Sequence, residues 1–545
     1  MRIGLLFVAA LCLVVLFTGL GRVGALDQRE ARDLGVAREL IEYREALTPI
    51  LGSEPLLDKP LLAYAPDVMV RVASHAPETG SRIWRALAAA VLVLLTGSIG
   101  ARHLGARAGL CAAGVLASTL ALPLAARTDG TQLLGSLLSW LGAAELADAL
   151  FGRAGGRDAR LIVAYGALSA ALMCAGPLPA LWPLVAVALY VRLARRADGW
   201  SRVRALAGLA IMAGLALPWY GAMAERHGWE FLSRAPFFPY ALGARTSWFI
   251  GPFVAVSFLV VGFYPWSALL PGVFLHAAMW WPQPRSAIAA PPAAPDVAPM
   301  ARELGHEHAS HFFIACAAAS VLPLLLYPGP PLPAVLPALP ALALLSGRFL
   351  DHLIEDPERL AAPLARGLLM LALTGTVAAV LLALLAGRLR EAAPDLGLLA
   401  TVVFVVAWLP LLAGLARRRL LAALLMTLPV AAGTPLVALR VLPAMEGYLT
   451  TRTVAEAMNH RSPPRAPLVL ADEPPPSLRL YAARSLVRGP SLVTALRAFP
   501  ATDGFTYVAF RPSRERDVAS AAQRPLQVLA RTPSLILARV RPEAP

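Results

Sequence analysis

Five charged residues in this sequence have the types and positions that group-transfer chemistry requires. They are Asp27, directly after the first apolar segment, the neighbours Asp58 and Lys59, Asp129 in the stretch "RTDGT", and Arg245 just before a later apolar segment. A lysine or arginine binds phosphate through charge-assisted contacts, and a carboxylate can accept a proton from a hydroxyl. A proline follows Lys59 and fixes the direction of the chain there. We therefore expect Lys59 to bind a lipid phosphate, with carboxylates close by.

Each of these charges taken alone could be an ordinary residue at a membrane boundary, where charged side chains are common. The loop around Lys59 could equally be a structural corner. All five are expected on the same side of the membrane, at or beyond the ends of apolar segments. This shared placement favours a site at the membrane edge over scattered boundary charges.

The elements that must position these residues are long apolar segments. The chain of 545 residues is 58% hydrophobic and 15% charged, with a mean hydropathy of +0.63, which is typical of a protein embedded in a bilayer. A spanning helix needs roughly 20 apolar residues, and about thirteen segments suit this role. They cover residues 3–21, 84–100, 107–126, 131–150, 160–174, 177–193, 205–220, 250–275, 311–327, 332–347, 365–387, 396–415 and 420–440. The sequence thus predicts a polytopic α-helical membrane protein with about thirteen transmembrane helices.

The distribution of arginine predicts which loops face the cytoplasm. With a cytoplasmic N-terminus, arginine clusters such as 153–160, 195–204 and 417–419 fall on the inner side. The short outer turns 127–131, 174–177 and 327–331 are nearly free of cations, and one outer turn, 388–397, departs from this rule. We expect a multi-pass protein of the cell inner (plasma) membrane with an extracytoplasmic C-terminus. A cleaved signal peptide is the alternative for the first segment.

Two regions outside the spanning segments are large. The first outer loop, 22–83, contains "ARDLGVARELIEYREAL", whose apolar spacing at Leu34, Ala37, Ile41 and Leu47 predicts an amphipathic helix at the membrane surface. Residues 441–545 alternate strand and helix patterns and are expected to form a small extracytoplasmic α/β domain after a transmembrane domain of residues 1–440. We also expect a fourth outer loop at 221–249 and a cytoplasmic linker at 276–310.

Composition and spacing argue against two other kinds of site. The net charge of +15 does not indicate a nucleic-acid partner, because the arginines lie in short clusters between apolar runs. The stretch "HEHASH" at 306–311 lacks the His spacing of an HExxH zinc site and fits a variable linker better. The four cysteines have no CxxC spacing and are expected to be buried apolar residues.

Several motifs resemble, in order, those of polytopic GT-C glycosyltransferases related to protein O-mannosyltransferases and the lipid A aminoarabinose transferase. "EARDLGVAREL" and "LTPILGSEPLLDKPLLAYA" resemble the two conserved stretches of the family's first outer loop, and "RTDG" resembles its second outer turn. "ALPWYGAMAERHGWEFL", "VVGFYPWSALLPG" and "PAVLPALPALALLSGRFLD" resemble later helix ends, so the resemblance spans nearly the whole chain. It implies a sugar donor linked to polyprenyl phosphate and an envelope lipid, glycan or protein as acceptor, with membrane lipids around both.

The resemblance also implies roles for the charged residues. Lys59 and Arg245 would bind the donor phosphate, and Asp58 would orient Lys59 or bind a divalent metal, the one cofactor that this pattern raises without requiring it. Asp27 would be the general base, and Asp129 would orient the acceptor or support the base.

Three positions depart from the family pattern. Arg29 stands where the family has its catalytic Asp, so Asp27 could fill that role only if the loop shifts by two residues. Ala175 replaces a lysine, and Tyr240 stands where a histidine is expected.

Three functions fit these residues. The first is a membrane glycosyltransferase that inverts the sugar's anomeric carbon. The second is a non-catalytic, degenerate family member or scaffold in envelope glycan assembly, which the lost residues favour. The third is a flippase for lipid-linked sugars, which would need inverted repeats and charges in mid-membrane, whereas the charges of this chain cluster on one side.

Overall fold

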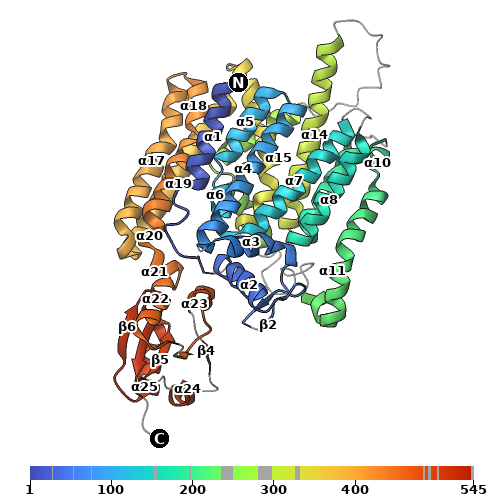
Figure 1. The fold of residues 1–545 in the computed structure, drawn as a ribbon. Coiled ribbons are helices and arrows are strands. Elements are labelled where there is room, and N and C mark those ends of the chain that lie inside the picture. Colours follow the sequence, from blue (N-terminus) through green and yellow to red (C-terminus); the bar gives the residue numbers. More distant parts are fainter. Residues whose placement is uncertain are drawn as a thin grey trace.

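The computed structural model describes residues 1–27, 29–52, 54–74, 76–151, 156–194, 198–234, 250–279, 297–325, 332–464, 466–482, 485–488, 492–499 and 503–541. They form a bundle of long helices with a small mixed α/β unit at one end (Figure 1). The N-terminus lies at the opposite end of the bundle from this unit, and helices α2 and α3 lie at the same end as the unit (Figure 1).

Eight helical stretches among the described residues are long and apolar enough to cross a membrane. They are Pro77–His103, Gly130–Phe151, Arg157–Ala175, Asp198–Gly228, Ala334–Glu355, Ala361–Arg388, Ala393–Leu415 and Arg419–Ala444. Two bent helix pairs bring the number to ten if each counts as one span, and the helices Arg2–Phe17 and Pro177–Leu193 are apolar but shorter. The expected polytopic helical fold is confirmed in this coarser form, and the count of about thirteen stays a prediction.

The individual helices follow the apolar pattern of the sequence. Those of the bundle are α1 (Arg2–Phe17), α4 (Pro77–His103), α5 (Ala106–Ala117), α6 (Ala121–Thr128), α7 (Gly130–Phe151), α8 (Arg157–Ala175), α9 (Pro177–Leu193), α10 (Asp198–Val203), α11 (Ala205–Arg234), α12 (Ile250–Gly262), α13 (Leu270–Met279), α14 (Val297–Leu325), α15 (Leu339–Glu355), α16 (Ala361–Arg388), α17 (Ala393–Leu415), α18 (Arg419–Leu425), α19 (Leu428–Leu436), α20 (Leu442–Ala444) and α21 (Glu446–Leu449).

Two of the expected spans are broken, and the two breaks contact each other. Helices α5 and α6 meet at 55°, and the second pair, around Pro265, bends by 108°. A proline cannot donate to the helix ladder, which accounts for the second break. The Leu120 N–H donates to the Tyr264 carbonyl at 3.0 Å, and the Trp266 indole N–H donates to the Ser118 hydroxyl at 2.9 Å. These bonds satisfy groups that the broken helices leave free, as an apolar environment demands.

The first loop folds as a compact cap on one end of the bundle. It contains α2 (Glu30–Glu42), a two-stranded hairpin of β1 (Ile50–Leu51) and β2 (Glu54–Pro55), the 3₁₀ turn η1 (Leu61–Ala63) and α3 (Ala65–Ala73). Glu, Ala, Arg and Leu dominate α2 and are strong helix formers. Of the predicted apolar face, Leu34 and Ala37 are buried, whereas Ile41 is exposed. Helix α2 therefore packs into the protein through its first turns.

The C-terminal unit, residues 452–541, has the strands expected from the sequence. β3 (Leu468–Leu470), β4 (Leu486–Val487), β5 (Thr506–Phe510), β6 (Gln527–Arg531) and β7 (Ile536–Val540) form one sheet in the order β4-β3-β5-β7-β6. β3 is parallel to β4 and β5, and β7 is antiparallel to its two neighbours. The helices of the unit are α22 (Arg452–Arg461), α23 (Pro476–Tyr481), α24 (Leu492–Ala498) and α25 (Glu515–Ala522), and the last is the helix expected there.

Two expected loops are partly helical. The predicted linker 276–310 begins inside α13, and from residue 297 onward it is the first half of α14, which includes "HEHASH". The predicted loop 221–249 is helical to Arg234, and residues 235–249, with Tyr240 and Arg245, lie outside the described residues. Polar helix formers continue both helices beyond their apolar parts, so hydropathy alone ends them too early.

Candidate active site

Asp129 lies at a sharp corner between two helices of the bundle. It is the single residue between α6 and α7, within the predicted turn 127–131. One carboxylate oxygen accepts a hydrogen bond at 3.0 Å from the Gln132 N–H, which is the N-cap contact of α7. The other forms an ion pair with Arg29. The carboxylate is 2% exposed, and among the described residues both of its oxygens are engaged.

The corner that holds Asp129 is fixed by its neighbours in the chain. The Arg127 guanidinium donates to the carbonyls of Val15 at 3.3 Å and Thr18 at 2.8 Å, at the end of α1. A Cβ atom on Gly130 would lie 2.7 Å from the Trp84 ring and 2.9 Å from Arg85 Nε, so only glycine allows this approach of α7 to α4. The position of Asp129 is therefore set by three helices.

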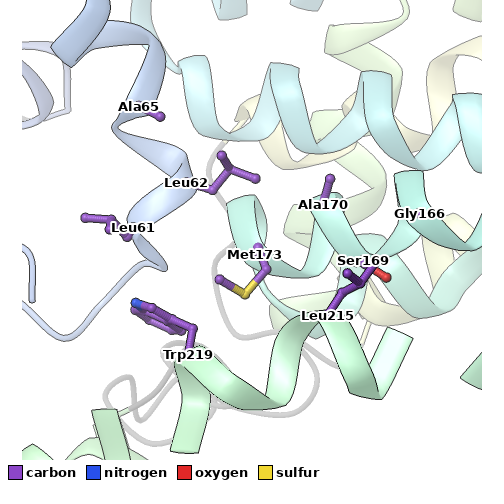
Figure 2. Close-up of a pocket in the computed structure, with 9 residues that line it drawn as sticks. All are labelled: Leu61, Leu62, Ala65, Gly166, Ser169, Ala170, Met173, Leu215 and Trp219. Carbon is purple, nitrogen blue, oxygen red and sulfur yellow. The ribbon is translucent and has the colours of Figure 1, made fainter. Parts of the chain in front are cut away.

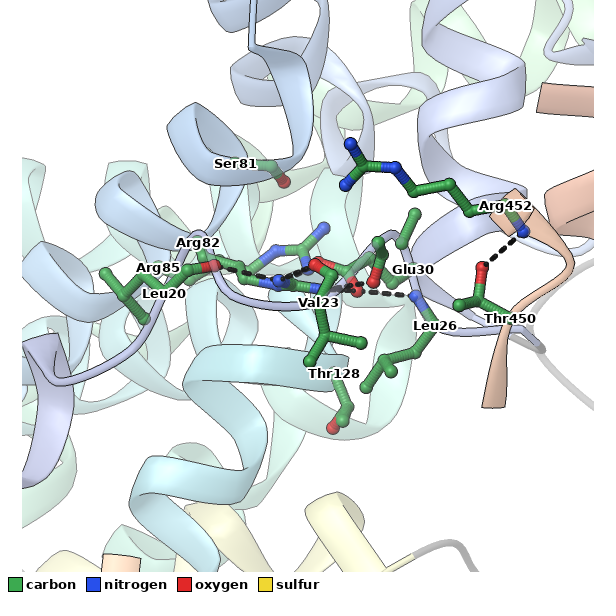
Figure 3. Close-up of polar contacts among 12 residues, drawn as sticks. Leu20, Val23, Leu26, Glu30, Ser81, Arg82, Arg85, Thr128, Thr450 and Arg452 are labelled. Atoms are coloured by element: carbon green, nitrogen blue, oxygen red, sulfur yellow. Dashed lines mark hydrogen bonds and ion pairs between the residues drawn. The ribbon is translucent and has the colours of Figure 1, made fainter. Parts of the chain in front are cut away.

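The start of α2 is held against the bundle by a buried arginine. Arg82 of α4 donates to Glu30 at 2.8 and 2.7 Å and to the carbonyls of Leu20, Val23 and Gly24 at 2.7–2.8 Å (Figure 3). These contacts use all five N–H groups of the guanidinium. Glu30 also holds the segment before α2, because its carboxylate accepts the Leu26 N–H at 2.9 Å.

Arg85, one turn later on α4, links α2 to α3. It lies 3.4 Å from Glu30 and 3.3 Å from Asp67, and its side chain is fully buried. The Trp84 indole N–H donates to Asp67 at 2.8 Å, and the Ser81 hydroxyl donates to the same carboxylate. We call Glu30, Asp67, Arg82 and Arg85 the buried network. Because its charges are paired and out of solvent, it orders the first loop and is not available to a substrate.

Lys59 lies among the charged residues of the first loop and the corner at Asp129. Its ammonium donates to Asp33 at 2.7 Å and lies 5.6 Å from the centre of the Tyr64 ring, and its side chain is 17% exposed. Burial opposes the lysine's charge, but the carboxylates of Asp33, Asp129 and Asp58 outweigh it and raise its pKa. Burial also raises the pKa of Asp33, against the attraction of Lys59. The ammonium thus stays charged, and the carboxylate beside it becomes more basic.

Asp58, the neighbour of Lys59 in the chain, contacts other residues than Asp33 does. It forms an ion pair with Arg32 at 3.0 Å and accepts a hydrogen bond from the Tyr64 hydroxyl at 3.3 Å. The cations Arg32 and Lys59 lie next to this carboxylate and would compete with a divalent metal for it. In the part of the chain that the structure describes, His, Cys, Asp and Glu do not gather in a group of three that could hold one. We call Arg29, Arg32, Asp33, Asp58, Lys59 and Asp129 the site cluster.

Asp27, the expected general base, faces the C-terminal unit. Its carboxylate accepts the Ser477 N–H at 2.8 Å at the start of α23, and its own N–H donates to the Leu449 carbonyl at 2.9 Å. Burial raises its pKa, and the bonds from Ser477 lower it to a smaller extent. Among the described residues, its side chain forms no hydrogen bond or ion pair with the site cluster.

An apolar pocket begins two residues after Lys59. It has a volume of about 390 Å³ and lies between η1, α8 and α11 (Figure 2). Its lining residues are Leu61, Leu62, Ala65, Gly166, Ser169, Ala170, Met173, Leu215 and Trp219. The two polar groups of this lining are bonded elsewhere, since the Ser169 hydroxyl donates to the Tyr165 carbonyl at 2.7 Å and the Trp219 indole to the Leu47 carbonyl at 3.1 Å. The pocket therefore offers a ligand an apolar surface.

The structure brings together three of the five residues that the sequence singled out, Lys59, Asp58 and Asp129. It places Asp27 elsewhere, and Arg245 lies outside the described residues. Sequence reasoning missed Arg32 and Asp33, and it took Arg29 only as a lost aspartate. The signal was present, because Arg29 and Asp33 are four residues apart and so share one face of a helix.

A second missed signal is that Lys59 is the single lysine of the chain, since arginine fills every other basic position. Arginine is a rigid planar fork that favours fixed bidentate pairs, whereas lysine is a compact point charge with rotatable donors. The lysine at this position therefore indicates a specific requirement.

Two solved structures have a similar fold. ArnT from Cupriavidus metallidurans in its apo state superposes with a TM-score of 0.76 at 17% identity, covering 98% of this chain and 97% of that chain. The structure of the same protein bound to undecaprenyl phosphate gives the same values. No protein-family model and no curated protein matches the sequence. Likeness at this identity shows the fold alone: the chain has the fold of ArnT, and the fold that its motifs predicted is confirmed to that extent.

Proposed function

We propose that the protein is a membrane glycosyltransferase that moves a sugar from a polyprenyl-phosphate donor to an envelope lipid, glycan or protein. The observation that carries this proposal is the Lys59 ammonium, the chain's single lysine, two residues from the apolar pocket. A polyprenyl phosphate has one charged end and one long apolar chain. The ammonium suits the phosphate, and the pocket suits the first isoprene units. The likeness to ArnT, which has been solved with undecaprenyl phosphate, supports the same donor class.

In this proposal each residue of the site has a role that follows from its position. Lys59 stabilises the charge that develops on the leaving lipid phosphate, and Arg245 assists it. Asp58 orients the lysine loop through Arg32 and Tyr64. Asp129 supports the acceptor side through Arg29, which lies on its carboxylate and is one-third exposed. The contacts of Asp27 favour a role in docking the C-terminal unit over a role in proton transfer.

The proposed membrane orientation places the site cluster and the C-terminal unit outside the cytoplasm and the N-terminus inside. The arginine clusters support it through the positive-inside rule. A fusion of alkaline phosphatase to the C-terminus should be active in cells, and a fusion of green fluorescent protein should be dark. A fluorescent, phosphatase-inactive C-terminus would contradict this orientation.

A second function has its own supporting observation. The ion pair between Arg29 and Asp129 leaves that carboxylate without a free oxygen among the described residues. A protein that binds the lipid-linked sugar without transferring it would have such a neutralised site. The two functions separate in one comparison, because both bind the donor and only the first forms a product.

The test measures binding and product formation together. Undecaprenyl phosphate added to the purified protein should change the tryptophan fluorescence, to which Trp219 in the pocket contributes, and protect Lys59, the single lysine, from an amine-reactive reagent. Lys59→Ala should weaken binding about ten- to a hundred-fold, because a charge-assisted contact contributes about 1.5–3 kcal/mol. Lys59→Arg should recover only part of this loss. Unchanged binding in Lys59→Ala would mean that the lysine turn is only a structural corner.

Product formation is measured in membranes of a strain that lacks the protein. These membranes supply the natural donor and acceptor, and mass spectrometry of their lipids and glycans identifies the product that appears when purified protein is added. A product identifies the sugar and the acceptor. Donor binding without any product would favour the non-catalytic function.

A further inference from the structure

Asp33 differs from the other carboxylates around Lys59 in what it contacts. Asp129 is shared between Arg29 and the N-terminus of α7, and Asp58 is held by Arg32 and Tyr64. Within the described residues, the group that contacts the Asp33 carboxylate is the Lys59 ammonium. Asp33 is thus tied to the cluster through the same cation that the donor phosphate would bind.

The phosphate and Asp33 therefore compete for one ammonium. A carboxylate and a phosphate ester are both strong acceptors for lysine, and a lysine side chain can rotate its donors from one to the other. The side chain of Asp33 is only 5% exposed, so it cannot gain full hydration when the lysine leaves it. An anion displaced within a buried site becomes a better proton acceptor.

We propose that binding of the donor phosphate to Lys59 releases Asp33, which then acts as the general base toward an acceptor hydroxyl. This inference rests on the proposed function and assigns the catalytic carboxylate within it. It also specifies the acceptor class, because a hydroxyl needs a base at neutral pH, whereas a phosphate acceptor is already ionised.

The step is balanced in atoms and charge. The acceptor oxygen forms a bond to the anomeric carbon, and the bond from that carbon to the donor's phosphate oxygen breaks. The bonding electron pair leaves with the polyprenyl phosphate, whose charge Lys59 offsets. The hydroxyl proton moves to Asp33 and is lost to solvent afterwards. The anomeric configuration inverts.

The helix itself permits this role. Asp33 lies in the first turn of α2, whose N-terminus is fixed through Glu30 by Arg82. Four residues earlier on the same face, Arg29 forms an ion pair with the Asp129 carboxylate. The face of α2 therefore presents a cation to Asp129 and an anion to Lys59, so donor binding at Lys59 frees the carboxylate on α2 and leaves Asp129 paired.

The deciding variant is Asp33→Asn, because the proposal predicts two effects of opposite direction. Removal of the competing charge should tighten binding of undecaprenyl phosphate several-fold and make Lys59 more reactive to an amine reagent. Loss of the base should slow product formation in the complemented membranes by about a hundred-fold or more. A purely structural defect would weaken binding and slow the reaction together.

Two further variants keep the result interpretable. Glu42→Gln removes an exposed acid from the last turn of the same helix and should change neither measurement. Asp33→Glu retains the competing charge, so donor affinity should stay within about threefold of wild type, while the displaced carboxylate lowers the rate about tenfold.

The outcomes separate this inference from the proposed function. Wild-type protein that neither binds undecaprenyl phosphate nor forms a product removes the proposed function, and the inference with it. Wild-type protein that does both, together with an Asp33→Asn variant that keeps the wild-type rate or binds the lipid no more tightly, overturns the inference alone.

Discussion

Replacing Arg82 by methionine should destabilise the protein more than replacing any exposed arginine. Arg82 donates all five of its N–H groups to buried acceptors, and no other described side chain does so. Methionine has a similar length and fits an apolar site, but it donates no hydrogen bonds. The change removes five donors and leaves the carbonyls of Leu20, Val23 and Gly24 without them. Among the described residues, it also leaves Glu30, whose side chain is fully buried, with only the more distant Arg85 as a cation at 3.4 Å.

The expected magnitude follows from these contacts. Breaking one partner of a buried charge pair costs about 3–5 kcal/mol, since the remaining charge is left without compensation. The lost carbonyl contacts are not independent of it, so we do not add them separately. In detergent, the apparent Tm should fall by about 5 °C or more, and hydrogen exchange should increase in residues 20–34.

Two comparisons identify the cause of the loss. Arg22→Met removes an exposed arginine from the segment between α1 and α2, which Arg82 contacts, and should change the Tm little. Adding Glu30→Gln to Arg82→Met should restore part of the stability, because the buried carboxylate is then no longer charged. An Arg82→Met variant with the wild-type Tm and wild-type exchange in residues 20–34 would refute the idea that this guanidinium orders the start of α2.

Three other predictions concern two contacts of the first loop and the corner at Asp129. Tyr481→Phe removes the hydroxyl that accepts the Ala25 N–H at 2.6 Å, so exchange at Ala25 should rise in a hydrogen-exchange experiment, and unchanged protection would show that this contact is dispensable. The hydrogen bond from Arg226 lowers the pKa of Glu45 from 4.5 to about 2, so the stabilisation by this pair is complete above pH 4.5 and is lost as the pH falls toward 2. Accordingly, Glu45→Gln should lower the Tm more at pH 7 than at pH 3, and an equal effect at both would contradict the assignment. Gly130→Ala should reduce folded yield in size-exclusion chromatography, because its Cβ would meet the Trp84 ring, and a wild-type yield would show that α7 can shift.

The apolar segments and the strands of the C-terminal unit could be predicted because their patterns are local. A run of apolar residues predicts a helix and an alternating stretch predicts a strand without knowledge of the rest of the chain. The short polar stretch around Asp129 predicts the corner there in the same way. The break at Ser118 was not predictable in this way. It depends on contacts with Tyr264 and Trp266, more than 140 residues away, and local hydropathy continues through it.

The site could be predicted only in part, for a related reason. Lys59 and Asp58 stand out because a proline and apolar residues surround them, and Asp129 because its turn is so short. Asp33 and Arg29 lie within a stretch of charged residues that resembles any solvated helix. The burial of Asp33 and the pairing of both residues depend on tertiary packing, because α2 turns this face toward α4 and the Lys59 loop.

The first loop is attached on two sides, and this limits how the site can respond to a donor. Arg82 and Arg85 fix the start of α2 to the bundle, while Arg38, near its end, donates to the carbonyls of Arg479 and Leu480 in the C-terminal unit at 3.1 and 3.2 Å. A helix attached at both ends cannot swing away to admit a substrate without breaking buried contacts. Rotation of a lysine side chain breaks only its own ion pair. Donor binding should therefore act through the side chains of Lys59 and Asp33, which are joined by a hydrogen bond of 2.7 Å, and leave the backbone of α2 in place.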